Sequence, residues 1–407
     1  MAERSVRWMV AMLAGVLGCT GFGDTKDPAV ELAGPHASGI LSLPDSFDLK
    51  YVGSTAADDT AVYAMLAAHG TGTVNRSLWK VPKDAAPATR IWSQSNSPGQ
   101  DIGEPRVALS SDAVYWVQAA TGAPNAQKSC EVWRWGKDGK AEPAVKWTLF
   151  DGSFCRPAGF AISGTRVALA TITSACNSGD SSSAMELCPS QSLAGNLAVW
   201  SASASGNPSS SKPLSRLVAG YLDSAVAIDD SDVYWFEGVS PDNSGPGWNG
   251  GALYKTSGTQ ANDTVHTIMS FDSLSYPVGI AIAGSDVHVA FMPPMPDGGG
   301  PIMAGCKLAR VSKAGGAATP IADVPARLCF GLHSDGASSY YASQWIQDAG
   351  EQATEAVGRV PGSAGPLPGT VVLEREDLRL RQVLTSGTDL VLVSQHHVIK
   401  LPKSLVP

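Results

Sequence analysis

The chain has few charged residues and no concentration of positive charge anywhere along its 407 residues. Charged residues make up 16% of the sequence, and the net charge is -8, with lysine and arginine scattered. A protein that binds nucleic acid needs a basic face, so we expect no nucleic-acid partner. The hydrophobic content of 43% is high enough to bury a full core, which excludes a disordered chain.

The sequence also has no compact catalytic or cofactor-binding motif. It contains no Gly-x-Ser-x-Gly nucleophile elbow, no His-Glu-x-x-His zinc motif, no Walker loop and no dinucleotide fingerprint. The acidic string Asp229–Asp232 falls on an expected turn, where other repeats also place Asp or Ser, so it indicates a capped turn rather than a calcium loop. We expect no metal, no cofactor and no assigned catalytic residue, and an enzyme stays an alternative.

The N-terminus has the features of an export signal. Arg4 and Arg7 precede an apolar run that is too short to span a bilayer. The run ends in Val16–Cys19, which resembles the lipobox of bacterial lipoproteins. The resemblance implies cleavage before Cys19 and a lipid on its thiol. Residues 1–18 would then be a lipoprotein signal peptide, and residues 19–38 the lipidated cysteine with a polar tether.

An ordinary signal peptide with a cysteine at this place by chance is the alternative. The lipoprotein interpretation predicts a monomer held in the bacterial cell envelope, with the membrane as a partner through the anchor. Thr20 stands where the inner-membrane retention signal has Asp, which favours the outer membrane. The sequence does not indicate on which side of that membrane the protein lies.

What the sequence does have is a repeat of roughly fifty residues. Short β-branched and aromatic segments recur seven times, and the spacings between them are 50 to 54 residues except for one of 66. The segments align at Val62, Val114, Val167, Val233, Val287, Tyr340 and Leu390. An insertion in the third unit explains the long spacing.

Each unit is predicted to form four antiparallel strands, A to D. A short apolar strand A and a tight turn precede the aligned strand B, and a variable loop leads to an alternating strand C such as Val132–Trp135. Four such strands per unit are typical of a β-propeller blade. We predict an all-β propeller of seven four-stranded blades over residues 39–407. Six blades are the alternative if residues 163–222 are not one blade with an insertion.

Several segments resemble the repeats of YWTD-like and TolB-like bacterial propellers. The residues that carry the resemblance are Val114–Trp116, Val132–Arg134, Val233–Trp235 and Ala252–Lys255. The closing Thr-Asp of the YWTD motif is replaced by Val117-Gln118 and Phe236-Glu237. The resemblance therefore implies the fold over roughly residues 45–403 and nothing about a ligand.

The last unit ends after its strand C, and the apolar residues 39–43 precede the first strand A. We predict that residues 39–43 pair as the outer strand of the seventh blade and close the ring, because this removes an unpaired edge. The alternative is that they are linker.

Six cysteines remain after Cys19, an even number that favours disulfides in an exported chain. Two pairs occupy matching places in the repeat, with separations of 25 and 23 residues, and a third pair lies inside the insertion. The predicted disulfides are Cys130–Cys155, Cys176–Cys188 and Cys306–Cys329. Metal binding is disfavoured, because there is no Cys-x-x-Cys or Cys–His cluster.

The expected loops between strands B and C are long and project on one face, where function usually lies on a rigid scaffold. Residues that lead into the inner strands should rim the channel mouth on that face. These candidates are Glu104, Arg156, Asp223, Tyr276, Arg327 and Arg381. Trp248 and Trp345, in or beside those loops, and His333, in an inner strand, are further candidates for ligand contact.

The leading interpretation is a lipid-anchored binding module that presents this loop face to a protein, peptide or glycan. A lyase or hydrolase with a site at the channel mouth is the second, and a structural component of the envelope is the third. Propellers host all three roles, so the fold does not choose between them.

Overall fold

The computed structural model is an all-β structure. It describes residues 49–70, 73–84, 86–96, 105–119, 129–149, 156–172, 195–208, 212–214, 226–238, 251–257, 263–271, 276–292, 306–324, 328–346, 353–361, 370–373, 380–394 and 398–406. The predicted signal peptide, lipidation at Cys19, tether and closing strand 39–43 all lie outside these residues, so those predictions stay untested. The structure contains, within the described ranges, no helix of the length and apolarity that crossing a membrane requires.

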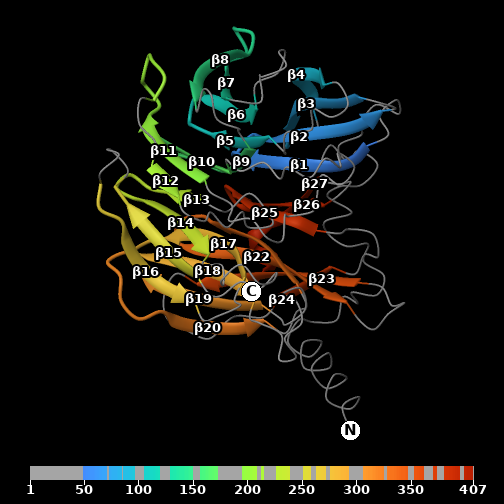
Figure 1. Ribbon diagram of the computed structural model, residues 1–407. Coiled ribbons are helices and arrows are strands. Elements are labelled where there is room, and N and C mark those ends of the chain that lie inside the picture. The colour runs from blue at the N-terminus through green and yellow to red at the C-terminus, as the bar shows by residue number, and fades with distance from the viewer. Residues whose placement is uncertain are drawn as a thin grey trace, which may run out of the picture.

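Seven antiparallel sheets follow one another along the chain, and we call them blades 1 to 7 (Figure 1). The first strands of the blades are β1 (Leu49–Ala57), β5 (Arg106–Leu109), β9 (Arg156–Ser163), β13 (Val226–Ile228), β17 (Tyr276–Ala283), β21 (Leu328–Ser334) and β25 (Leu380–Ser386). The second strands are β2 (Ala61–Gly70), β6 (Ala113–Ala119), β10 (Arg166–Ile172), β14 (Val233–Gly238), β18 (Asp286–Met292), β22 (Ser338–Ile346) and β26 (Asp389–Ser394).

The outer part of each blade follows the same order. The third strands are β3 (Thr73–Pro82), β7 (Cys130–Gly136), β11 (Gly195–Ser201), β15 (Gly251–Thr256), β19 (Cys306–Ser312), β23 (Ala353–Pro361) and β27 (Val398–Pro402). The fourth strands are β4 (Thr89–Asn96), β8 (Ala144–Leu149), β12 (Lys212–Leu214), β16 (His266–Phe271), β20 (Thr319–Val324) and β24 (Thr370–Leu373). In the described part of blade 7 the sheet has three strands, and a short turn of 3-10 helix, Lys403–Leu405, follows β27.

The first strands form the inner wall of a closed ring. Each contacts the first strand of the next blade, and β25 contacts β1, so the red end of the chain lies beside the blue start (Figure 1). Thr55 in β1 donates a hydrogen bond to the Gln382 side chain in β25, and Lys83 and the backbone of Asp58 both contact Ser386. The seven-bladed prediction is confirmed and the six-bladed alternative is wrong, because the four strands β9 to β12 form a single sheet.

The second strands are buried along most of their length, which explains why most of their residues are apolar. All seven residues of β6 are buried, because that strand lies between its own sheet neighbours and the two adjoining blades. Apolar clusters fill all seven boundaries between blades. Tryptophans fill the first of them: Trp92 packs on Trp116 and Trp133 with ring centroids 5.5 and 5.9 Å apart, between blades 1 and 2.

The structure corrects one detail of the repeat alignment. Ser334 of β21 pairs with Ser339, as Ile228 pairs with Val233 in blade 4. Ser339, one residue before the aligned Tyr340, is therefore the equivalent of Val233. The sequence alignment placed Tyr340 at this position, instead of Ser339, because Tyr340 has an aromatic ring. The correction makes Tyr340 the equivalent of Tyr234.

The first and second strands of each blade are joined by tight turns on one face of the ring, which we call the turn face. The opposite face, with the connections between second and third strands, is the loop face. An ion pair with one pattern crosses three boundaries on the turn face, and we call it the Asp–Lys clasp. Its copies are Asp58–Lys137, Asp229–Lys313 and Asp335–Lys403, at 2.8, 2.7 and 2.8 Å. Each aspartate also caps its own turn through backbone N–H groups.

The Cys306–Cys329 disulfide is present, as predicted, and joins β19 of blade 5 to β21 of blade 6 with the Cα atoms 5.8 Å apart. Cys130 is also disulfide-bonded. Its partner is not among the described residues, which leaves the predicted bond to Cys155 untested. Cys176 and Cys188 likewise lie outside the described residues.

Candidate functional site: the central cavity

The inner strands surround a central cavity of about 410 Å³. Its lining comes from the last residues of each inner strand, immediately before the turns, so the cavity lies toward the turn face. All seven blades contribute residues to it. The volume is in the range of pockets that bind small molecules in proteins.

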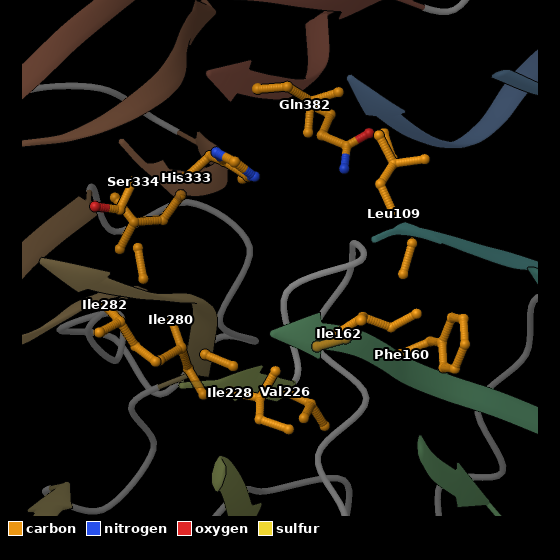
Figure 2. Close-up of a pocket in the computed structure, with 18 of the residues that line it drawn as sticks. Leu109, Phe160, Ile162, Val226, Ile228, Ile280, Ile282, His333, Ser334 and Gln382 are labelled. Carbon is orange, nitrogen blue, oxygen red and sulfur yellow. The ribbon is translucent and has the colours of Figure 1, made fainter. Parts of the chain in front are cut away.

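One side of the cavity is apolar. It is formed by pairs of large aliphatic or aromatic residues from three consecutive inner strands, β9, β13 and β17, as Figure 2 shows. These residues are Phe160, Ile162, Val226, Ile228, Ile280 and Ile282. We call this side the apolar arc. Each pair has one fully buried and one half-buried member, which places the half-buried isoleucines nearest the turns.

Polar side chains gather on the other side, where blades 6, 7 and 1 contribute them beside aliphatic residues of the same strands. His333 and Ser334 in β21 and Gln382 in β25 lie on it (Figure 2). Thr55 in β1 also lines the cavity and contacts Gln382. We call this side the polar arc. Thr55 Oγ1 donates to Gln382 Oε1 at 2.5 Å, so the carboxamide oxygen is turned toward β1. The carboxamide nitrogen of Gln382 points into the open space in Figure 2.

The imidazole of His333 is held by the neighbouring blade. Its Nδ1 lies 3.2 Å from the backbone nitrogen of Thr385, which donates to it, and 2.9 Å from Thr385 Oγ1. The Thr385 hydroxyl lies between Nδ1 and the Ser334 carbonyl oxygen, which is 2.9 Å away, and its one proton is shared between these two acceptors. Because a backbone N–H needs an acceptor, we assign Nδ1 as the acceptor and place the ring proton on Nε2.

Burial first, and then the nearby Lys403 ammonium, lower the pKa of His333 to about 4, against smaller opposing effects of Asp335 and the Ser334 backbone. The imidazole is therefore neutral at neutral pH. Among the described lining residues there is no aspartate, glutamate, lysine or arginine. The two charges that act on His333, on Asp335 and Lys403, neutralise each other in a clasp. The described lining is thus uncharged.

Gly331 allows the backbone of β21 to bend at this point. Its φ is +56°, in the left-handed region that favours glycine, and the pairing of β21 with β22 is irregular between Phe330 and Leu332. A Cβ at this position would lie 3.3 Å from the backbone nitrogen of Val383. The bulge therefore brings β21 close to β25 just before His333.

The predicted ligand-face residues have different outcomes. His333 lines the cavity near the turn face, and its contact with a ligand stays a prediction. Arg381 is half-buried in β25, next to Gln382, and is not part of the described lining. Arg156, Tyr276 and Trp345 lie in β9, β17 and β22, but the structure does not describe their side chains. Glu104, Asp223, Arg327 and Trp248 lie outside the described residues, so contact of these candidates with a ligand stays a prediction.

Sequence analysis missed the cavity-lining triplets. The three residues that pair with the start of each second strand are Phe160–Ile162 in blade 3, Val226–Ile228 in blade 4 and Ile280–Ile282 in blade 5. Each has alanine in the middle, and in blade 6 His333 occupies that middle position. The sequence repeat therefore contained a signal for the cavity: one blade has an imidazole where three others have alanine.

The comparisons with known proteins support the fold. No protein-family model and no curated protein sequence matches the chain. The β-propeller domain of the Trilobed protease from Pyrococcus furiosus is similar, with a TM-score of 0.52 and 8% identity over 87% of this chain and 93% of that one. The polysaccharide lyase Uly1 has a TM-score of 0.53 and 10% identity over 89% and 94%.

The acylaminoacyl peptidase from Pyrococcus horikoshii has a TM-score of 0.52 and 8% identity over 84% of this chain and 49% of that chain. This chain thus spans about half the length of that peptidase. At such low identities the similarity shows a propeller fold and nothing about ligand or activity. No group of three or more metal-ligating side chains occurs in the part of the chain that the structure describes.

Proposed function

We propose that the chain is a binding module that takes a small molecule into its central cavity. The observation that carries the proposal is the division of the lining into an apolar arc from blades 3 to 5 and a polar arc from blades 6, 7 and 1. Small-molecule sites in proteins have this composition: mostly apolar walls and a few fixed polar groups that orient the ligand.

The lining supports binding better than catalysis. Acid–base chemistry needs a titratable group within reach of the substrate, usually with a partner that tunes it. His333 is the one titratable side chain among the described lining residues, and Thr385 holds its Nδ1. The Ser334 hydroxyl donates to the Ser338 carbonyl oxygen and accepts from Gly336 N, so it caps the turn. The peptidase and lyase propellers among the similar structures show only that related folds occur in enzymes.

A ligand-observed NMR screen of small neutral fragments tests the proposal. The variant Ile282→Trp places a large ring at a half-buried lining position and should abolish binding of fragments that bind the wild type. Val145→Trp is the matched control, because Val145 is 41% exposed on the outer strand β8. A screen without hits, or hits that Ile282→Trp leaves unchanged, would contradict the cavity as the site.

We also propose that the module is a lipoprotein of the cell envelope, and its N-terminus provides the test. The support is the sequence: Arg4, Arg7, the apolar run and Cys19 in a lipobox-like context. The expected result is that mass spectrometry of the mature protein finds a diacylglycerol-modified N-terminal Cys19. A Cys19→Ala chain should stay in the aqueous phase on detergent partitioning. Cleavage at another residue without a lipid would refute the anchor. Loop-face binding of a protein, peptide or glycan remains a prediction for those loops.

A further inference from the structure

We propose that the ligand is an uncharged molecule with a hydrogen-bond acceptor, such as a carbonyl oxygen, at one end of an apolar body. The inference rests on the proposed function, because it specifies the chemistry of a ligand in the same cavity. It depends on which hydrogen-bonding atoms of the polar arc remain available once the contacts between blades have been made.

The acceptor atoms of the two central polar side chains are used inside the protein. Nδ1 of His333 accepts from the backbone N–H of Thr385, and Oε1 of Gln382 accepts from the Thr55 hydroxyl. What His333 and Gln382 keep are N–H groups: Nε2–H on the imidazole and the two hydrogens of the carboxamide nitrogen. The polar arc therefore offers donors, and a ligand that matches it must supply an acceptor.

The fixed orientation of these donors favours binding. A free glutamine carboxamide can turn over and present either its oxygen or its nitrogen, but the hydrogen bond from Thr55 to Oε1 selects one orientation. His333 is fixed in the same way by Thr385 of the next blade. Binding to either donor therefore requires little free energy to order its side chain, which is the advantage of a preorganised site.

The absence of charge from the described lining sets the net charge of the ligand. A carboxylate or an ammonium group would lose its hydration on entering and would find no opposite charge among the described lining residues. His333 cannot supply a positive charge at neutral pH, because burial keeps it in its neutral form. A neutral carbonyl, ester or amide oxygen loses less hydration and gains one or two N–H donors in exchange.

The apolar arc accommodates the remainder of the ligand. Ile228, Ile280 and Ile282 face the polar arc across the open space (Figure 2). An apolar body on this side would contact aliphatic carbon and remove its own surface from water, at roughly 25 cal/mol per Å². A ligand with its acceptor toward blades 6 and 7 and its apolar body toward blades 4 and 5 satisfies both arcs at once.

Four compounds with one skeleton separate these requirements. Benzophenone has a neutral acceptor, diphenylmethane has none, benzoylbenzoate adds a negative charge, and diphenylmethylamine adds a positive charge. Isothermal titration calorimetry with the folded protein should give the tightest binding for benzophenone. Diphenylmethane should bind about fivefold more weakly, the effect of one hydrogen bond of about 1 kcal/mol. The two ions should bind at least about tenfold more weakly than benzophenone.

Two variants remove the donors. Gln382→Leu keeps the approximate side-chain volume but removes both the N–H donor and the acceptor of the Thr55 hydroxyl. His333→Asn keeps an acceptor for the Thr385 N–H but is too short to present the second nitrogen. In each variant the preference for benzophenone over diphenylmethane should shrink to about twofold or less. The matched controls are Gln118→Leu and His288→Asn, which change a buried glutamine and a buried histidine outside the cavity lining. Both controls should keep the fivefold preference.

The outcomes separate the two proposals. Equal affinity for benzophenone and diphenylmethane, with both blocked by Ile282→Trp, overturns the acceptor inference and leaves the binding function standing. Tightest binding of benzoylbenzoate or diphenylmethylamine also overturns the inference. If none of the four compounds binds, or if Ile282→Trp blocks none of them, both the inference and the proposed function are wrong. A circular dichroism melt of each variant confirms that a lost signal is not lost folding.

Discussion

The two arcs of the ring hold their inner strands together in different ways. In the apolar arc, β9, β13 and β17 meet through aliphatic side chains, and they approach closely: a Cβ on Gly159 would lie 2.8 Å from Val226 Cγ2. In the polar arc, hydrogen bonds from one blade to the next join β21, β25 and β1. The comparison teaches that one repeated backbone tolerates two kinds of contact between the inner strands of neighbouring blades. The cavity lies where the apolar contacts and the polar contacts face each other.

The difference has a consequence for how the arcs respond to substitution. Aliphatic packing loses free energy in proportion to the volume removed, whereas a buried polar contact is costly when one partner is removed and the other stays. The apolar arc should therefore be sensitive to side-chain size, and the polar arc should be sensitive to the identity of single atoms.

The largest effect is expected in the apolar arc. Phe160 is 5% exposed and packs between blades 2 and 3, so Phe160→Ala should lower the free energy of unfolding by about 3–5 kcal/mol. Urea denaturation monitored by tryptophan fluorescence measures the change. Val145→Ala, on the exposed outer strand, should change it by less than about 0.5 kcal/mol. A similar loss in the two variants would show that Phe160 is not part of a tight core.

The Cys306–Cys329 disulfide joins the last blade of the apolar arc to the first blade of the polar arc. Replacing both cysteines by alanine should cost about 2–4 kcal/mol, because the unfolded chain gains freedom. The loss should appear in a thermal melt of the double variant and also in the wild type after reduction. If the melts are unchanged, the two arcs are held together without the covalent bond.

Glu355 tests the polar contacts between blades 6 and 7. It is 1% exposed in β23, and its two carboxylate oxygens accept from the backbone N–H of Leu380 at 2.8 and 2.9 Å. Glu355→Leu would leave this buried N–H without its acceptor and should cost about 2–3 kcal/mol in urea denaturation. Glu355→Gln retains an acceptor oxygen and should restore part of that loss. Equal losses for the leucine and glutamine variants would argue against the hydrogen bond as the cause.

The smallest effect concerns pH. Burial lowers the pKa of His333 to about 4, and burial likewise lowers that of His288 to about 4, compared with 6.5 for an unperturbed histidine. Because the folded pKa is lowered, their contribution is complete above pH 6.5 and is lost as the pH falls from 6.5 to 4. His333→Asn should remove about 1–2 kcal/mol of this pH dependence. Melts at a series of pH values measure it, and an unchanged slope would contradict the assignment.

The Asp–Lys clasps titrate in a separate, more acidic range. Burial alone would raise the pKa of Asp229, but the Lys313 ammonium and the N–H groups of Asp232 and Ser231 outweigh it and lower the pKa to about 2. The contribution of this clasp is therefore complete above the ordinary value of 3.8 and is lost between 3.8 and 2. The histidine effect can thus be measured without interference from the clasps.

The blades could be predicted from sequence because second strands such as β6 and β14 are buried on both sides. Burial demands continuous apolar residues, and these recur at a nearly constant spacing that a single sequence reveals. The disulfide between Cys306 and Cys329 followed from the same spacing. Alignment went wrong by one residue at Tyr340, where serines occupy positions that carry apolar residues in other blades.

The cavity was harder to predict. The Thr55–Gln382 hydrogen bond joins residues 327 positions apart, and it exists only because the ring closes. Sequence reasoning proposed the residues that lead into the inner strands, because these should rim the channel mouth on the loop face. The described cavity lining lies nearer the turn ends of those strands, and its uncharged residues resemble ordinary core residues in sequence. His333 was identified because it is an imidazole in an inner strand, but its tautomer depends on Thr385, which no local pattern indicates.

The asymmetry of the lining also fixes how a chiral ligand can lie in the cavity. A ring of seven equal blades would present the same surface at every rotation about its axis, and a bound molecule could take seven equivalent positions. Here the donors of His333 and Gln382 mark one direction across the ring, and the turn face distinguishes the two directions along its axis. The order of the two different donors around the ring, His333 in β21 before Gln382 in β25, supplies the third distinction that a handedness requires. We therefore expect the protein to distinguish mirror-image forms of a ligand whose acceptor lies next to a stereocentre.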